Sequence, residues 1–557
     1  MLAPRALVLS SLVCAPPALA QSYAIQSLSA PNPSINAQLG WANAIDGTTL
    51  IAGAPRHFGP GLVQGGTAYV YERGASGDWS DVQELARSQA ASHQWFGHAV
   101  DLDGELAVVG APGGPSAIAP EGAAYVYARQ PGGGWSELAR LSAGVAGVDD
   151  DYGQCVAVEG DHVYVGAPGA LVGGLAAGAV YVYERQADNS FALVAELVAF
   201  DAAAGDRFGH SLDVSSQNLV IGVPGDDDVA AEAGSVYWFP ADGPNAWVLK
   251  GKLYASNAAE SDEYGTSLAL EGTRLLVGAE LADQVLQFDA GAAYALERTP
   301  TGFWSERDIL ASPQAVTLGR FGSGVALEGD RALIGAPLEF ADGIGASGRA
   351  YLYEWDSSDS LQLRDEFVSP DPPSSNGLGR QVALEGGWVV AGSFADSSAE
   401  IQAGVVELYW SYANTGLPGP SFAGFGTKGC DGPQNMGVNT APLLGAADFA
   451  LTCSAAPRSA QGFLLLGGAA DPGGIDLLGL GLIFHVDVVG SGPSFLVLPM
   501  GSDASGTGSV NLPLPSSPQL AGQLVHAQAV WAWTSCTLSQ SAGLSSSDLA
   551  SLTLTAP

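Results

Sequence analysis

Short apolar runs separated by Gly-rich turns recur along most of the chain. Leu106–Val109 is apolar at every position, which predicts a strand with both faces buried. The next run, Gly122–Tyr127, alternates more, and we expect such strands to face outward. Turns such as Val158–Asp161 contain a Gly that permits the positive φ of a tight hairpin. The pattern predicts many short antiparallel strands rather than long helices.

The same pattern returns seven times at a nearly constant spacing of 56 or 57 residues. Each repeat begins with an aromatic residue or Leu followed by Gly: Leu39-Gly40, Phe96-Gly97, Tyr152-Gly153, Phe208-Gly209, Tyr264-Gly265, Phe321-Gly322 and Leu378-Gly379. A second glycine stands thirteen residues after the first: Gly53, Gly110, Gly166, Gly222, Gly278, Gly335 and Gly392. Five of these second glycines open Gly-Ala-Pro or Gly-Val-Pro. Internal repetition is therefore the main signal of the sequence.

Each repeat is interpreted as four antiparallel strands, which is one blade of a β-propeller. The seventh repeat stops after Gly404–Tyr409, before a fourth strand. The segment Tyr23–Leu28 precedes the first repeat and has the pattern of that missing strand. We therefore expect an all-β chain with a seven-bladed propeller over residues 21–410, closed by its N-terminal strand so that no edge is left open.

The aromatic-Gly block followed by Gly-Ala-Pro resembles the FG-GAP repeat of integrin α-subunit propellers, and more closely the bacterial versions in secreted proteins. The resemblance covers about residues 23–410. It implies ligand binding across one face of the propeller and, often, calcium in loops. Integrin-type loops insert an Asp-x-Asp-x-Asp-Gly run between the first two strands, which supplies the oxygen ligands that calcium needs. Here that interval has room only for a hairpin with one acid at its turn: Asp46, Asp103, Glu159, Glu271, Glu328 or Glu385. Calcium is therefore not expected at those turns.

The charge of the chain excludes some classes of partner. Lys and Arg number 20 against 57 Asp and Glu, a formal net charge of −37. Nucleic acid binding needs the opposite balance, so no nucleic acid partner is expected.

The first twenty residues resemble a cleaved signal peptide, with Arg5, an apolar run and a small-x-small site at Ala18–Ala20. We expect a secreted or cell-surface protein, with the periplasm as an alternative, no transmembrane segment and a monomeric state.

The repeat is lost after residue 410. Residues 411–429 are rich in Gly, Pro and Ser and are interpreted as a linker. Residues 430–557 are interpreted as a small β-sandwich-like module with strands at Asp448–Thr452, Gly462–Leu466, Leu480–Val489, Phe495–Leu498 and Leu524–Trp533. Cys430, Cys453 and Cys536 lie in this region and allow one disulfide, but the sequence does not choose the pair. The role of the module is left open.

Acidic residues concentrate in the loops of repeats three to five. The loops before first strands contain Asp149, Asp150, Asp151, Asp201, Asp206, Glu260, Asp262 and Glu263, and the loops between second and third strands contain Asp226, Asp227, Asp228, Glu232 and Asp283. In blade geometry both kinds of loop open on the same face. We call these residues the acidic sector. A solvated rim is the first interpretation, a divalent ion such as calcium or a basic ligand the second, and paired carboxylates of a glycosidase the third.

No catalytic or cofactor-binding motif is present in the sequence. His98 and His210 follow aromatic-Gly pairs, but Gln154, Thr266, Ser323 and Arg380 occupy the same position in other repeats. A position that accepts such different residues favours a structural interpretation over a catalytic one. We expect a non-catalytic binding or adhesion scaffold that contacts an extracellular protein or glycan. The alternative is a secreted polysaccharide hydrolase or lyase with carboxylates on the central propeller face, which would need two converging carboxylates.

Overall fold

The computed structural model describes residues 21–410, except 24–25, 75–78, 114–120, 144–149, 244, 285, 341–345, 357–359 and 370–375, together with strand backbones in the C-terminal region. Every element in this described part is a β-strand. Its residues include no helix that is long and apolar enough to cross a membrane. The predicted signal peptide, residues 1–20, lies outside the described residues.

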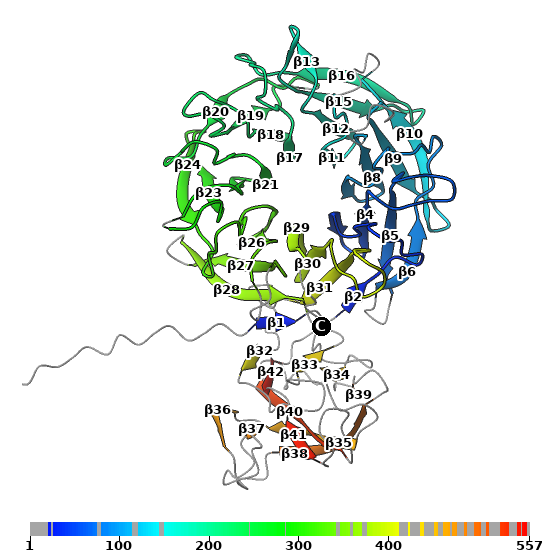
Figure 1. Cartoon of the computed structure of the whole chain (residues 1–557), viewed down its shortest axis with the longest axis vertical. Coiled ribbons are helices and arrows are strands. Elements are labelled where there is room, and N and C mark those ends of the chain that lie inside the picture. Colours follow the sequence, from blue (N-terminus) through cyan, green and yellow to red (C-terminus); the bar gives the residue numbers. More distant parts are fainter. Residues whose placement is uncertain are drawn as a thin grey trace, which may run out of the picture.

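Seven antiparallel sheets follow one another around a central axis (Figure 1). Blade one contains β3 (Ala42–Asp46), β4 (Thr49–Ala54), β5 (Thr67–Arg73) and β6 (Trp79–Glu84), and blade two contains β7 (Ala99–Asp103), β8 (Leu106–Ala111), β9 (Ala123–Arg129) and β10 (Trp135–Leu141). Blade three contains β11 (Val156–Glu159), β12 (His162–Ala167), β15 (Ala179–Arg185) and β16 (Phe191–Leu197). The loop between β12 and β15 contains a small hairpin of β13 (Leu171–Val172) and β14 (Leu175–Ala176). Blade four contains β17 (Ser211–Ser215), β18 (Asn218–Val223), β19 (Ser235–Pro240) and β20 (Gly251–Leu253).

The remaining three blades follow the same plan. Blade five contains β21 (Ser267–Glu271), β22 (Arg274–Ala279), β23 (Ala292–Arg298) and β24 (Trp304–Leu310), and blade six contains β25 (Val325–Glu328), β26 (Arg331–Ala336), β27 (Arg349–Trp355) and β28 (Leu361–Val368). Blade seven contains β29 (Leu378–Glu385), β30 (Trp388–Ser393), β31 (Val405–Trp410) and the N-terminal strand β2 (Gln26–Leu28). The first strands contact one another in a closed ring, β3–β7–β11–β17–β21–β25–β29 and back to β3. The predicted seven-bladed propeller is therefore confirmed.

The N-terminal segment closes the ring, but in two pieces. β2 pairs antiparallel with β31, with Gln26 opposite Leu408, so it is the fourth strand of blade seven as predicted. β1 (Gln21–Tyr23) instead runs parallel to β28 of blade six. Tyr23, which was predicted to start the closing strand, therefore belongs to a different blade. The N-terminal segment thus joins two neighbouring blades at their outer edges.

The blades pack face to face, and this buries the third strands. All seven residues of β27 are buried, and five of the seven in β5 are buried. One apolar cluster, for example, combines Ile51 and Val70 of blade one with Tyr125 of blade two. The expectation that third strands face outward is wrong because a neighbouring blade covers each of their two faces. The innermost and outermost strands are only partly buried, as β7 and β24 show.

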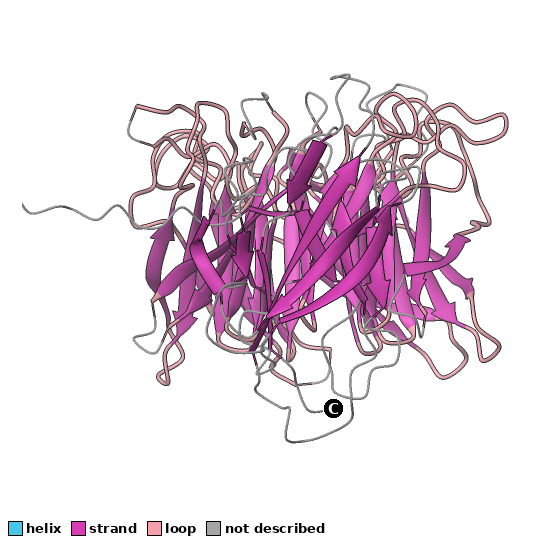
Figure 2. Ribbon diagram, turned by 90° about the horizontal axis from the view of Figure 1, so that it is seen from below, coloured by secondary structure: helices cyan, strands magenta, loops and turns pink. Residues whose placement is uncertain are grey.

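The propeller has two unlike faces, visible on either side of the strands in Figure 2. The lower face carries the two tight hairpins of each blade. The upper face carries the longer loops between second and third strands and the connections between blades. Parallel bridges such as Gly66 to Phe96 and Gly234 to Tyr264 join these two kinds of loop. The prediction that both open on the same face is confirmed.

The C-terminal region forms two sheets from the strands that the structure describes. β33 (Asn435–Val438), β34 (Ala450–Ser454), β35 (Gln461–Gly467), β38 (Phe495–Ser502), β39 (Gly508–Asn511), β40 (Leu524–Trp533), β41 (Gly543–Ser546) and β42 (Leu549–Thr553) belong to a nine-stranded sheet. The ninth strand, β32 (Ser421–Ala423), lies within the predicted linker, and β36 (Ala470–Ile475) pairs with β37 (Phe484–Val486). All five predicted strands overlap described ones, while the sandwich arrangement stays a prediction.

Candidate functional site

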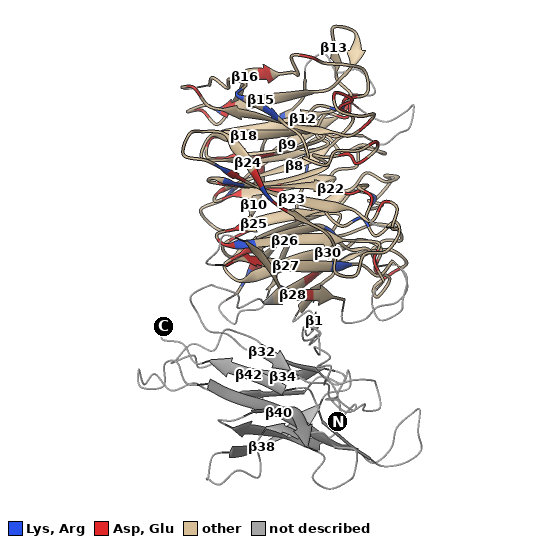
Figure 3. Ribbon diagram, turned by 90° about the vertical axis from the view of Figure 1, so that its left-hand side faces the viewer, with Lys and Arg blue, Asp and Glu red and all other residues tan. Residues whose placement is uncertain are grey.

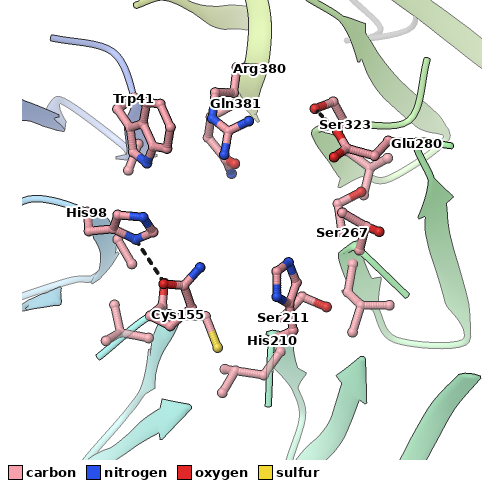
Figure 4. Close-up of a pocket in the computed structure, with 18 of the residues that line it drawn as sticks. Trp41, His98, Cys155, His210, Ser211, Ser267, Glu280, Ser323, Arg380 and Gln381 are labelled. Carbon is pink, nitrogen blue, oxygen red and sulfur yellow. Dashed lines mark hydrogen bonds between the residues drawn. The ribbon is translucent and has the colours of Figure 1, made fainter. Parts of the chain in front are cut away.

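A cavity of about 320 Å³ lies at the centre of the ring of blades. It is lined from every blade by the residue that directly follows the aromatic-Gly or Leu-Gly pair, which we call the ring position. The seven ring residues are Trp41, His98, Gln154, His210, Thr266, Ser323 and Arg380. Figure 4 shows Trp41, His98, His210, Ser323 and Arg380 around the same space. The sequence analysis placed six of these residues, all but Trp41, at equivalent positions of the repeats, and the closed ring brings all seven together.

The aromatic-Gly pair is the local device that presents each ring residue. His98 N donates a hydrogen bond to Trp95 O at 3.1 Å, which closes a four-residue turn. Phe96, the second residue of the turn, is fully buried, and Gly97, the third, has φ 90°. A type II turn requires positive φ at its third residue, and glycine supplies it without strain. The motif therefore fixes the backbone, while the side chain at the ring position can differ between blades.

The first residue of each turn, two positions before the glycine, is in an unusual conformation. In six blades it is not glycine, and its φ lies between 50° and 62°: Gln38, Trp95, Asp151, Arg207, Glu263 and Arg320. Gly377 occupies the position in blade seven. A left-handed conformation costs a non-glycine residue about 1–2 kcal/mol. Because the conformation recurs in every blade, it is part of the backbone geometry of the repeat.

The two carboxylates that line the described part of the cavity are both held by arginine. Glu263 Oε1 accepts a hydrogen bond from Arg207 at 2.7 Å. Glu280 Oε1 pairs with Arg320 at 3.0 Å, and its Oε2 accepts from the Ser323 hydroxyl at 2.6 Å. Each carboxylate therefore has a cationic partner, and neither is free to bind a cation without losing one.

Arg380 differs from Arg207 and Arg320, the arginines that pair with the two carboxylates of the cavity. Its guanidinium lies 3.9 Å from the ring centroid of Trp41, a stacked cation–π contact. It forms neither a hydrogen bond nor an ion pair with any residue that the structure describes. Burial lowers the pKa of Arg380, against the opposing charge of Glu280, yet a guanidinium stays protonated in proteins. Among the described residues that line the cavity, Arg380 is thus the cation that makes no direct ion pair with a carboxylate.

The two histidines of the cavity are neutral at pH 7. Burial, and then the charge of Arg380, lower the pKa of His98 to about 3. Burial, and then the charge of Arg207, lower the pKa of His210 to about 4. His98 Nδ1 lies 3.3 Å from the carbonyl oxygen of Gln154, and only a donor can make that bond. His98 Nε2 is therefore an acceptor.

Two aspartates stand further along the inner strands, in blades two and four. Asp101 Oδ2 accepts from Val158 N at 2.7 Å, and Asp213 Oδ2 accepts from Leu270 N at 2.6 Å. Burial raises the pKa of Asp101 to about 7 even though the bond from Val158 lowers it. Asp213 is raised to a pKa of about 7 by burial, with the charge of Asp101 contributing. These residues titrate near neutrality, and sequence reasoning missed them.

The acids at the lower hairpin turns join neighbouring blades. Asp46 Oδ2 accepts from Gly104 N at 2.6 Å, one blade further on. The same bond recurs around the ring, from Asp103 to Gly160, Glu159 to Ser216 and Gln217, Ser215 to Gly272, Glu271 to Gly329, Glu328 to Gly386 and Glu385 to Gly47. These side chains therefore form a continuous belt on the lower face, which explains the recurrent acid as a contact between blades.

The core of the acidic sector is occupied by the protein's own ammonium group. Lys252 Nζ pairs with Asp201 Oδ2 at 2.9 Å, with Asp228 Oδ2 at 2.7 Å and also with Asp226 Oδ2. Tyr254 donates to the same Asp228 oxygen at 3.0 Å. Burial alone would lower the pKa of Lys252, but hydrogen bonds to these carboxylates raise it above its ordinary value. The structure thus brings Asp226 and Asp228 together around a lysine.

Most of the other predicted acids have separate partners. Asp227 Oδ1 accepts from Glu232 N at 2.7 Å within one loop, and Asp262 Oδ2 accepts from Ala259 N at 2.8 Å in another. Glu263 points to Arg207 at the cavity. Asp150 and Asp151 lie in the connection that enters blade three, and Asp149 lies outside the described residues. Figure 3 shows that Asp and Glu outnumber Lys and Arg across the blades.

Within the described residues, no group of three or more His, Cys, Asp or Glu side chains is arranged to hold a metal ion. Sequence reasoning found the acidic sector but missed Lys252, which lies 51 residues from Asp201. It also missed Trp41, Glu280 and the role of Arg380. The strict recurrence of the ring position was the only signal in the sequence for the cavity. It indicates where the lining residues lie but not which ligand they bind.

Comparison with known proteins identifies the repeat. The FG-GAP repeat family matches residues 79–127, 135–183, 191–239, 247–296 and 304–353. Each matched segment runs from the fourth strand of one blade through the third strand of the next. No curated protein sequence matches the chain. The chain thus contains five segments that match the FG-GAP repeat, within a β-propeller of seven blades.

Proposed function

We propose that the protein is an exported, non-catalytic binding scaffold whose upper propeller face contacts an extracellular protein or glycan. The observation that carries this proposal is the position of exposed apolar side chains. Large apolar residues are exposed in the upper-face loops at Ile35, Phe58, Val63, Leu171, Leu175, Val198, Phe200, Val229, Leu286, Phe288, Leu318, Phe340 and Ile401. In the described lower-face turns the corresponding residues are Val248 and Phe303. Exposed apolar side chains gathered on one face are typical of an interaction surface.

One group of these side chains lies over blades five and six. Leu286 is 89% exposed and Phe288 is 69% exposed in the upper loop of blade five. Leu318, in the connection to blade six, donates its N–H to Phe288 O at 2.8 Å and is itself half exposed. We call these three residues the apolar patch. Tight hydrogen bonding between the loops holds the patch in one conformation, which lowers the entropy lost on binding.

Export rests on sequence features. The leader-like first twenty residues and the net charge of −37 support a protein that is released and stays dispersed outside the cell or at its surface. We propose a monomer, because the ring is closed by its own N-terminal strand and the propeller needs no second copy to complete a blade.

A polysaccharide hydrolase or lyase is the alternative, and one observation supports it: Glu263 and Glu280 both line the central cavity. Both are engaged by arginine, however, whereas a general acid must hold a proton. Binding is therefore the function that this geometry favours. Incubation with neutral and acidic polysaccharides, followed by measurement of new reducing ends and unsaturated products, tests the alternative, and we expect neither product.

The scaffold is tested by screening the purified protein against arrays of glycans and extracellular proteins. The variant Phe288→Ser should lose most of the binding found for the wild type. Phe303→Ser is the matched control, because Phe303 is the same residue type and 73% exposed but lies in a lower-face turn. Equal loss in both variants, or loss only in the control, would contradict use of the upper face.

A further inference from the structure

We infer that the central cavity is a binding site for a sugar residue carrying a single carboxylate, a uronic acid, with Arg380 as the group that binds the carboxylate. The inference rests on the proposed function and specifies the ligand of the upper face. It starts from the charge balance of the cavity described above. Arg207 and Arg320 are each paired with a glutamate, while the Arg380 guanidinium stacks on Trp41 and makes no direct ion pair with any residue that the structure describes.

An arginine in this setting is suited to bind a carboxylate. The planar guanidinium offers parallel N–H donors that match the two oxygens of a carboxylate. Stacking on Trp41 fixes the plane of the Arg380 side chain in advance, so little rotamer freedom is lost on binding. Burial away from bulk water strengthens the interaction, since a less polar surrounding screens the charges less.

The rest of the cavity is suited to hydroxyl groups. The other ring residues include His98, Gln154, His210, Thr266 and Ser323, and all of these are neutral hydrogen-bonding groups at pH 7. His98 Nε2 is free to accept a hydrogen bond because Nδ1 is engaged by the Gln154 carbonyl. Sugar hydroxyls donate and accept equally well, and they match a lining that mixes acceptors with donors.

Size and total charge narrow the ligand further. A volume of about 320 Å³ is at the lower end of the range of small-molecule sites, which fits one or two sugar residues. The chain carries a net charge of −37, so a polyanion would be repelled as it approached. One carboxylate on an otherwise neutral sugar avoids this repulsion. An acidic peptide would present the same carboxylate, but it has fewer hydroxyl groups than a sugar to bond with the neutral residues of the lining.

Isothermal titration calorimetry of the full chain with D-glucuronate, D-glucose and N-acetyl-aspartate α-methylamide, which has one carboxylate, tests the inference. We expect D-glucuronate alone to bind. Arg380→Gln should weaken its binding at least about tenfold, as expected on losing a charged hydrogen-bonded pair. Arg380→Lys should weaken glucuronate binding less than Arg380→Gln, because the positive charge remains. Some weakening is still expected, because lysine lacks the paired N–H donors of the planar guanidinium. Arg364→Gln is the matched control, because Arg364 is an exposed arginine on the outer strand β28 and pairs with Glu354.

Each outcome decides the inference. The inference fails if glucose and glucuronate bind equally well and Arg380→Gln does not change their binding. It also fails if none of the three compounds binds at about 20 mM, a concentration that would detect even very weak binding. Binding of N-acetyl-aspartate α-methylamide as tight as that of glucuronate would show an acidic peptide site instead. If Arg380→Gln does not fold, Arg380→Lys decides the same question. Array ligands that depend on Phe288 and not on Arg380 would leave the scaffold proposal standing while this inference fails.

Discussion

The side-chain amide of Gln26 brackets the backbone of Trp79. Gln26 Nε2 donates to Trp79 O at 2.9 Å, and Trp79 N donates to Gln26 Oε1 at 3.1 Å. Gln83 makes the same two bonds to Trp135 one blade further on, both at 2.7 Å. Gln26 lies in the N-terminal strand of blade seven, whereas Trp79 starts the outer strand of blade one. The closing strand therefore uses the same contact as a covalently continuous blade.

This equivalence predicts the effect of breaking the bracket. Gln26→Ala removes two hydrogen bonds and should lower the free energy of unfolding by about 1–3 kcal/mol, as should Gln83→Ala. Chemical denaturation followed by Trp fluorescence measures both. Gln130→Ala is the control, because its side chain bonds only to Ala128 and Ser136 of its own blade. Destabilisation by Gln83→Ala with none by Gln26→Ala would show that β2 does not hold the ring closed.

The aspartates of the inner strands predict a dependence of stability on pH. Asp101 has a pKa of about 7 in the folded protein and about 3.9 when unfolded, so its folded pKa is raised. Its contribution to stability is fully present below pH 4 and is lost as the pH rises toward and through 7. Asp101→Asn keeps an acceptor for Val158 N and cannot ionise.

The melting temperature of Asp101→Asn, measured from pH 4 to pH 9, should therefore rise relative to the wild type as the pH increases. The gap should widen most between about pH 4 and pH 7, level off above pH 7, and correspond to on the order of 1 kcal/mol or more at the alkaline end. Asp213→Asn should behave in the same way. Parallel curves for variant and wild type would mean that Asp101 ionises normally in the fold.

The sequence was sufficient to predict the ring because the fold is repetitive. Glycine is required at Gly97 by a turn and at Gly110 by the approach of the next blade, and both requirements return in each repeat. The position of β1 could not be predicted, because Gln21–Tyr23 and Gln26–Leu28 are both short polar-apolar segments that suit either of two adjacent sheet edges. The burial of the third strands depends on neighbours that a single repeat does not reveal.

The site was harder to predict than the fold. Trp41 and Arg380 are separated by six repeats and meet only because the ring closes. The side chain at the ring position varies between repeats, which favours a structural interpretation when each repeat is considered alone. A constant backbone with variable side chains is also what a binding surface needs. The acidic sector was found by composition, but composition does not show that Lys252 points into it rather than into solvent.

Lys252 provides a test of the calcium hypothesis. Its side chain is 8% exposed and bonds to Asp201, Asp226 and Asp228, so Lys252→Gln leaves buried Asp226 without a cation. We expect a loss of about 3–5 kcal/mol in stability, as for other buried pairs that lose one partner. Calcium chloride should raise the melting temperature of this variant and leave the wild type unchanged. A calcium-dependent rise in the wild type would instead show that the folded protein binds the ion while Lys252 is in place.

Two glycines in blade two separate the role of space from the role of backbone conformation. A Cβ on Gly110 would overlap the carbonyl oxygen of Gly153 in the next blade. Gly104 has φ 57° and nothing within 4 Å of its Cβ position. Gly104→Ala should therefore cost only the strain of a left-handed residue, about 1–2 kcal/mol. Gly110→Ala must push two blades apart around a closed ring, and it should lower the midpoint of denaturant unfolding by clearly more. An equal or smaller effect at Gly110 would mean that the blades can separate there, and the second glycine of each repeat would need a different explanation.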